Sequence, residues 1–70
     1  MMKKKTQRYE RRQAEAREDA IGVMMTYKQE IDAQRVRMNA SRNGFVRRCC
    51  QQEIDQLKAE KAAIEAEVVG

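Results

Sequence analysis

The spacing of apolar residues in the last third of the chain constrains the fold more than any other feature. Cys50, Leu57 and Ile64 lie seven residues apart. A companion row, four residues further along in each heptad, consists of Ile54, Lys61 and Val68. Residues with this spacing form one stripe on a helix, and such a stripe packs against a second helix. The pattern predicts a helix over residues 45–68.

A weaker heptad pattern occupies the first half of the chain. Apolar residues recur at spacings of three, four and seven at Ala20, Met24, Tyr27, Ile31 and Met38. Upstream, the stripe fades into Tyr9, Gln13 and Ala16. We therefore expect one long helix over residues 7–39, preceded by a basic, flexible arm at residues 1–6.

The two patterns are out of phase with each other. Met38 and Ile54 are sixteen residues apart, whereas two heptads span fourteen. At about 100° per residue, the two stripes would lie roughly 160° apart on one straight helix. A turn at residues 40–44 removes this conflict and predicts an antiparallel, coiled-coil-like hairpin of two helices. A kinked continuous helix is the alternative.

Residue types near this break suit a turn. Asn43 and Gly44 favour the positive φ that ends many helices, and Ser41 is an alternative cap for the second helix. The 70-residue chain has no proline and only 4% aromatic residues, which suits helices better than a sheet. A disordered chain would show the same 37% of charged residues but no periodic apolar stripe. The expected fold is all-α, in a single unit of residues 1–70.

The first helix carries more apolar surface than one partner helix covers. The apolar residues between Ile21 and Tyr27 point around more than half of the helix, whereas a hairpin partner covers a stripe of about 100°. We therefore expect the hairpin to be completed by oligomerisation or by docking to a partner. The predicted seam and interface residues are Ala20, Ile21, Val23, Met24, Met25, Tyr27, Ile31, Met38, Cys50, Ile54, Leu57, Ile64 and Val68.

The net charge of +4 is distributed in alternating blocks. Residues 1–17 and 35–48 each carry +5, while residues 18–34 and 49–70 each carry −3. Arginines on one helix face suit a row of phosphates, so the basic blocks are candidate nucleic-acid-binding regions. Their residues are Lys3, Lys4, Lys5, Arg8, Arg11, Arg12, Arg35, Arg37, Arg42, Arg47 and Arg48.

The segment KTQRYERRQAEAREDAIG, residues 5–22, resembles the arginine-rich RNA-binding helix of the N antitermination proteins of lambdoid phages. The residues that match the family pattern in order are Lys5, Thr6, Arg8, Glu10, Arg11 and Arg12. The resemblance implies a helix in the groove of an RNA hairpin, with the three arginines on phosphates. Gln7 departs from the pattern, because the family has an arginine there, and roughly three quarters of the chain shows no likeness.

The residues that most enzymes require are missing from the sequence. There is no histidine, the commonest general base and nitrogen ligand. Cys49 and Cys50 have no second cysteine pair with which to form a zinc site, and as neighbours on a helix they diverge by about 100° and do not bond to each other. No glycine-rich phosphate loop is present. We expect no enzymatic activity, metal, cofactor or small-molecule substrate.

No targeting segment is visible in the sequence. The basic N-terminal residues are followed by polar residues, where a signal peptide would have an apolar region. The longest mostly apolar stretch, AIGVMMTY, is too short to span a bilayer. We expect no membrane association, and an intracellular, reducing location.

Two functions are consistent with these features. The first is a non-enzymatic structural or interaction protein that self-associates or docks into a larger assembly; by analogy, small basic chains of this kind resemble accessory or virion proteins of phages and other viruses, which act in the host cytoplasm. The second is an RNA- or DNA-binding regulator that uses its basic N-terminal helix, as an antiterminator does. The first explains the excess apolar surface, and the second explains the basic blocks.

Overall fold

The structure is a computed structural model that describes the backbone of residues 3–69 and the side chains of residues 7–69. It consists of helices α1 (Lys3–Ala16), α2 (Ala20–Ala40) and α3 (Gly44–Val69), and these described residues contain no strand. The all-α class is therefore confirmed. The number of helices differs from the expectation, because residues 3–69 form three helices rather than two.

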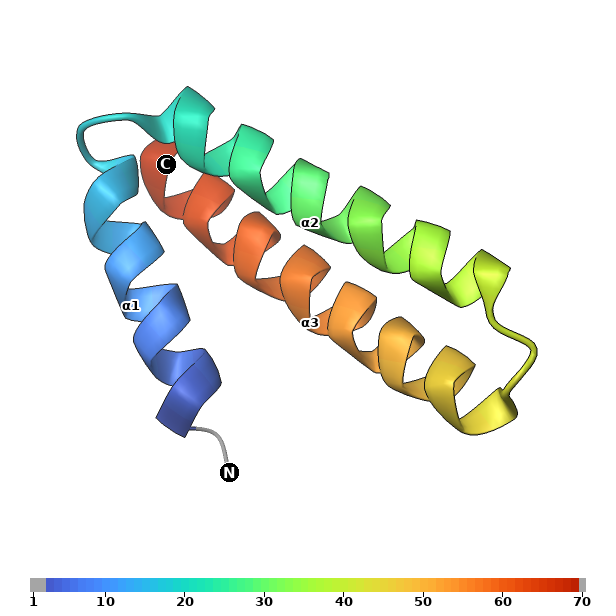
Figure 1. Cartoon of the computed structure of the whole chain (residues 1–70). Coiled ribbons are helices and arrows are strands. Elements are labelled where there is room, and N and C mark those ends of the chain that lie inside the picture. The colour runs from blue at the N-terminus through green and yellow to red at the C-terminus, as the bar shows by residue number, and fades with distance from the viewer. Residues whose placement is uncertain (1–2, 70) are drawn as a thin grey trace.

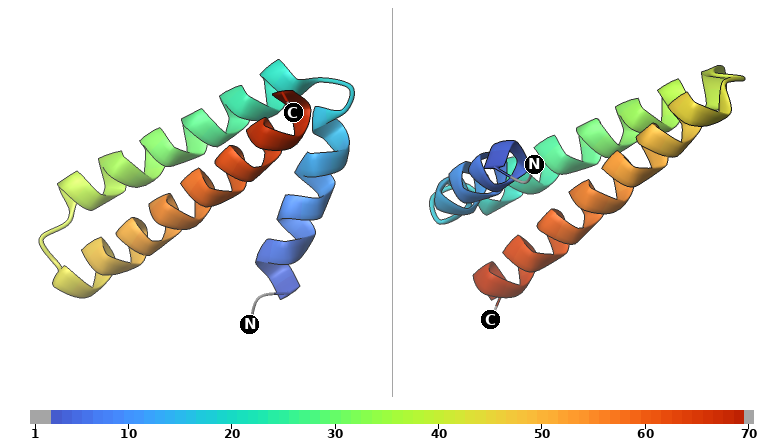
Figure 2. Two further views of the ribbon diagram at one scale, coloured as in Figure 1. Left: turned by 180° about the vertical axis from the view of Figure 1, so that it is seen from behind. Right: turned by 90° about the horizontal axis from the view of Figure 1, so that it is seen from below.

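Helices α2 and α3 lie side by side and run in opposite directions, and α1 folds back from the open end of this pair (Figure 1). Views from behind and from below show that the axes of α2 and α3 cross at a shallow angle (Figure 2). The molecule is elongated, with extents of 40 × 24 × 16 Å. In the part of the chain that the structure describes, no helix has the length and apolar character needed to cross a bilayer.

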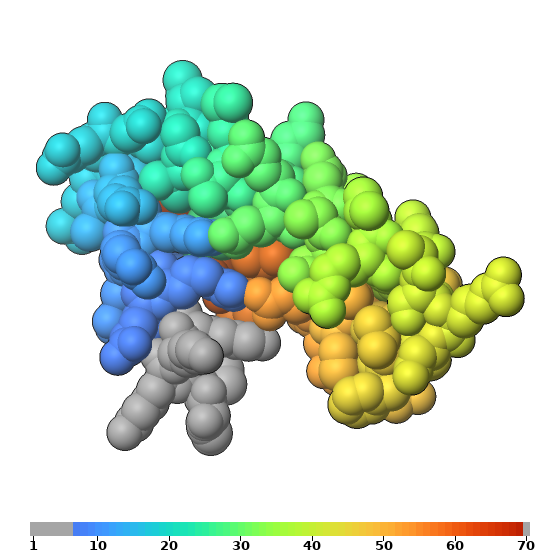
Figure 3. Space-filling view, in the orientation of Figure 1, coloured from blue at the N-terminus to red at the C-terminus, as the bar shows by residue number. Residues whose placement is uncertain are grey.

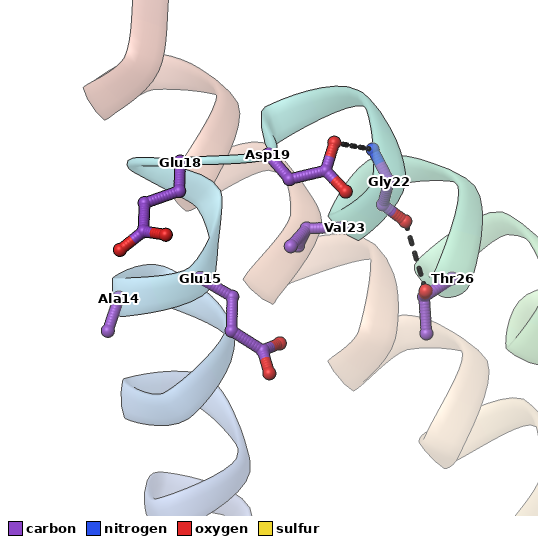
Figure 4. A pocket seen from close by; sticks show the side chains of 7 residues that line it. All are labelled: Ala14, Glu15, Glu18, Asp19, Gly22, Val23 and Thr26. Carbon is purple, nitrogen blue, oxygen red and sulfur yellow. Dashed lines mark hydrogen bonds between the residues drawn. The ribbon is translucent and has the colours of Figure 1, made fainter.

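The break between α1 and α2 lies at residues 17–19, so the expected single helix over residues 7–39 is wrong. Asp19 has non-helical dihedral angles, φ −144° and ψ 72°, and its carboxylate accepts a hydrogen bond of 3.0 Å from the backbone N–H of Gly22 (Figure 4). It is thus the N-cap of α2. An aspartate directly before the first periodic apolar residues is a recognised helix start, so the sequence itself carries a signal for this break.

Gly22 is required by this cap rather than by the approach of another helix. A Cβ at this position would collide with the carboxylate of Asp19. The carbonyl of Gly22 also accepts a hydrogen bond of 3.0 Å from the hydroxyl of Thr26 one turn later (Figure 4). The sequence therefore accepts the weaker helix propensity of glycine so that the aspartate can cap the helix.

The chain turns between α2 and α3 at residues 41–43, within the expected interval of 40–44. The side-chain oxygen of Asn43 accepts hydrogen bonds from the backbone N–H groups of Phe45 (2.8 Å) and Val46 (3.3 Å), so Asn43 caps α3. The expected positive φ at Asn43 or Gly44 is absent, because no described residue has a positive φ. The turn is built by side-chain capping instead.

The core lies between α2 and α3, and α1 closes one end of it. Tyr27, Ile54, Leu57 and Ile64 are the largest fully buried side chains. Ala16 is buried where α1 meets the pair, with Tyr9, Met24 and Met38 packed around the same cluster. The stripe that fades upstream of α2 is therefore the contact face of α1.

Candidate functional site

A buried carboxylate, Glu60, organises the contact between the three helices. Its side chain is only 4% exposed. It accepts two hydrogen bonds from the guanidinium of Arg8 (3.1 and 2.8 Å), one from the hydroxyl of Tyr27 (2.9 Å) and one from the amide of Gln56 (2.9 Å). A buried charge is tolerated only when it is paired and hydrogen-bonded, and Glu60 meets both conditions.

Two arginines of α1 form ion pairs with carboxylates of the other two helices. Arg8 reaches α3, where it also binds Glu53 at 2.7 Å. Arg12 forms a two-pronged ion pair with Glu30 of α2, with N–O distances of 2.8 and 2.6 Å. Its guanidinium also lies 4.7 Å from the centre of the Tyr27 ring, a cation–π contact. We call these residues, together with Glu60 and Gln56, the carboxylate network.

Charged and neutral groups of the carboxylate network stabilise each other. Burial raises the pKa of Glu60, but hydrogen bonds from Arg8, Gln56 and Tyr27 outweigh it and the net pKa is lowered. The hydrogen bond from Arg12 lowers the pKa of Glu30. Burial and the hydrogen bond to Glu60 raise the pKa of Tyr27. Both glutamates are therefore ionised at neutral pH, and Tyr27 keeps the proton that it donates.

The carboxylate network has the properties of a structural joint. Among the described residues, no buried side-chain nitrogen or oxygen lacks a hydrogen-bond partner. Nor does any group of three or more potential metal ligands gather within that part of the chain. A hollow at the corner of α1 and α2 is lined by Glu15, Glu18 and Asp19, and the carboxylate of Asp19 is turned to the cap described above (Figure 4).

The arginines expected to bind nucleic acid fall into two groups, those in ion pairs within the chain and those exposed to solvent. Arg8 and Arg12 contact carboxylates of the same chain, whereas Arg11 is exposed. The five arginines of residues 35–48 are all exposed. The side chains of Lys3, Lys4 and Lys5 lie outside the described residues.

The predicted seam residues fall into three groups by burial. Those buried are Val23, Tyr27, Ile31, Cys50, Ile54, Leu57 and Ile64. Those half-buried are Ala20, Met24 and Met38. Those exposed are Ile21 (76%), Met25 (55%) and Val68 (47%). Apolar surface remains on the outside of the molecule, and it is concentrated at the open end of the α2–α3 pair.

The exposed group lines a groove between the start of α2 and the end of α3. We call it the apolar groove; its lining residues are Ala20, Ile21, Met24, Met25, Lys28, Lys61, Glu65, Val68 and Val69. The groove lies away from α1. Arg12 of α1 contacts Glu30 of α2, and Lys28 of the groove, two residues before Glu30, lies roughly 160° around α2 from Glu30. Lys61 and Glu65 form an ion pair of 3.0 Å on its rim.

The opposite end of the α2–α3 pair is strongly basic. We call residues 35–48 the arginine tip; it projects away from α1 at the right of the space-filling view (Figure 3). Arg47 donates hydrogen bonds to the carbonyls of Met38 (3.0 Å) and Ser41 (3.3 Å) and so caps the end of α2. Phe45 and Val36 are each 68% exposed at this end.

Sequence reasoning missed Glu60 and the docking of α1. Glu60 lies three residues after Leu57 and four before Ile64, beside the buried stripe, and this spacing was the signal for its burial. Tyr27 was a further signal, because a buried tyrosine hydroxyl needs a partner.

No protein-family model, curated protein or solved structure matches the chain. The two surfaces at the ends of the α2–α3 pair are therefore the basis for assigning a function.

Proposed function

We propose that this chain is a non-enzymatic interaction protein that self-associates through the apolar groove. The observation that carries the proposal is the exposure of Ile21, Met25, Val68 and Val69 on one open face. Contiguous apolar patches rimmed by polar residues mark interaction sites on soluble proteins. The side chains of methionine also adapt to the shape of a partner surface.

A second copy of the chain suits the charges around the groove. The rim carries both signs, with Lys28 and Lys61 beside Glu65. In a two-fold arrangement, the same patch meets itself, which allows a lysine of one copy to face the glutamate of the other. A two-fold axis perpendicular to the α2–α3 pair also sends the arginine tips to opposite ends. Arg35 lies eleven residues along α2 from Met24 of the groove, about 16 Å at 1.5 Å per residue, so the two tips begin roughly 30 Å apart. This separation is well beyond the screening length of about 8 Å.

The expected affinity is modest. Fully burying an apolar side chain of this size stabilises by about 1.5–3 kcal/mol, and each copy contributes four that are already partly covered. The cost of association is about 4–15 kcal/mol. The gain from the eight side chains exceeds this cost by several kcal/mol at most, so we expect a weak dimer with a dissociation constant in the micromolar to millimolar range.

Phosphate binding by α1, as the resemblance to antiterminators implies, is less well supported. Arg8 and Arg12 would have to leave Glu60 and Glu30 to reach a phosphate.

An intracellular location remains part of the proposal, because Cys49 and Cys50 are both free thiols and reducing compartments preserve thiols.

Sedimentation velocity over a range of concentrations tests the proposal. Met25→Asp places a carboxylate in the groove and is expected to raise the dimer dissociation constant at least tenfold, about 1.4 kcal/mol. Val36→Asp is the matched control, because Val36 is an exposed apolar residue of the same helix outside the groove. Ile31 and Leu57 are unsuitable sites for this test, since both are buried and a charge there would unfold the chain.

Two results would refute self-association. One is a wild-type chain that remains monomeric up to millimolar concentration. The other is an equal effect of Met25→Asp and Val36→Asp, which would show that the groove is not the contact surface.

A further inference from the structure

The arginines of the arginine tip differ from Arg8 and Arg12 of α1, which are paired with carboxylates of the same chain. Residues 35–48 contain five arginines and no acidic residue. All five side chains are exposed, and within the described residues none forms an ion pair. Arg47 contacts backbone carbonyls, but those contacts leave its positive charge in place. The tip is therefore a concentrated positive surface without internal neutralisation.

An exposed aromatic ring accompanies this charge. Phe45, the single phenylalanine of the chain, is 68% exposed in the first turn of α3. The hydrogen bond from its backbone N–H to the Asn43 side chain fixes that turn. Arg48 follows three residues later and so lies next to Phe45 on the same helix face. The ring and the guanidinium group therefore project into solvent from the same face of α3.

We propose that the arginine tip binds single-stranded nucleic acid. The guanidinium groups contact backbone phosphates, and Phe45 stacks on an unpaired base. Stacking platforms combined with basic surfaces are the usual means of binding single strands, because every base offers a flat face. A duplex hides those faces, so it lacks the contact that Phe45 offers.

The residue types at the tip favour a phosphodiester chain over an anionic membrane. All five basic residues are arginines, whose planar groups make two-pronged contacts with phosphate. A helix that lies in a membrane interface presents a row of large apolar residues. Here Phe45 is followed on the same side of α3 by Arg48, Cys49 and Gln52, all exposed. The tip also lies at the far end from the apolar groove, so this activity is separate from self-association (Figure 1).

Paired charge-removal variants test the proposal. The tip variant combines Arg35→Gln, Arg42→Gln and Arg48→Gln, and it retains Arg47 because that residue caps α2. The control variant combines Arg11→Gln, Arg17→Gln and Lys58→Gln, which are exposed positions outside the tip. Both variants lower the net charge of +4 by the same three units. Circular dichroism first verifies that both retain the helicity of the wild type.

Binding is measured by fluorescence anisotropy with a labelled oligouridine of about 20 nucleotides, which exceeds the usual site of a small domain. The guanidinium of Arg47 is bonded to backbone carbonyls, so four of the five tip arginines are counted as phosphate contacts. Each contact on a single strand contributes about 0.7 to the salt slope, so four contacts give a fall in affinity of about 50-fold between 50 and 200 mM salt. The tip variant, with one contact left, should lose only about 3-fold over the same range. The control variant should keep a wild-type slope.

Phe45→Ala separates stacking from charge. It should lower affinity for the oligouridine about tenfold, within the range measured for base stacking, without changing the salt slope. It should not change affinity for a duplex of the same length.

Three results would overturn the proposal. The first is equal loss of binding in the tip and control variants, which would mean that net charge alone attracts the oligouridine. The second is equal affinity for the single strand and the duplex, unaffected by Phe45→Ala. The third is binding to phosphatidylserine vesicles that depends on Phe45, without binding to the oligouridine.

Discussion

Replacing Arg8 by methionine should destabilise the protein strongly, although arginines in a basic N-terminal segment usually serve only solubility. The methionine keeps much of the apolar stem of the side chain but removes three hydrogen bonds, two to Glu60 and one to Glu53. Glu60 would remain buried with only Tyr27 and Gln56 as donors. The change therefore leaves a carboxylate short of its charge partner.

The size of the effect follows from the burial of the two partners. Removing one member of a buried ion pair costs about 3–5 kcal/mol. The side chain of Arg8 is 20% exposed, so water replaces part of the lost interaction; we expect a loss of about 2–3 kcal/mol. A chain of this length has an unfolding free energy of about 4–10 kcal/mol, and the melting temperature should fall by about 10–20 °C.

Urea and thermal unfolding followed by circular dichroism measure this loss. Arg11→Met is the matched control, because Arg11 is an exposed arginine of the same helix; its effect should stay within about 0.5 kcal/mol. A double-mutant cycle of Arg8→Met with Glu60→Gln should show coupling, since removing one partner makes the second change less costly. Equal stability of the Arg8 and Arg11 variants would refute the reasoning.

Three further outcomes are expected. Gly22→Ala should gain less stability than Gly44→Ala in chemical denaturation. A Cβ at Gly22 displaces the carboxylate of the α2 cap, a loss of about 1 kcal/mol that offsets the better helix propensity of alanine. Gly44→Ala, with open space around its Cβ, should be neutral or stabilising by about 0.4–1 kcal/mol. A thiol reagent should modify exposed Cys49 at once and buried Cys50 only when the chain unfolds, as mass spectrometry will show; simultaneous labelling would contradict the burial of Cys50. Glu30 and Glu60 have a lowered pKa in the folded chain, so they stabilise the fold above their unfolded pKa of about 4.3. This stability is lost as the pH falls through their folded pKa. The melting temperature, measured as a function of pH, should therefore decline below pH 4, and the decline should be smaller in the Arg8→Met variant.

Helix type and the position of the main turn follow from short-range patterns in the sequence. The heptad spacing of Cys50, Leu57 and Ile64 determines which face of α3 is buried, and the phase shift between the two stripes locates a break before α3. Both inferences hold because helix geometry relates residues three, four and seven apart in the same way in every helix. The cap at Asp19 was equally local, and its signal was present in the sequence.

The roles of the charged residues depend on the tertiary structure. Arg8 and Glu60 are 52 residues apart in the chain, and they meet only because the break before α2 turns α1 back onto α3. Arg8 is consequently a partly buried ion-pair partner, while Arg11, three residues later, is exposed to solvent. A sequence records the sign of each charge, but the energy of a charge depends on its burial and on its distance from its counterion, and the packing of the helices sets both.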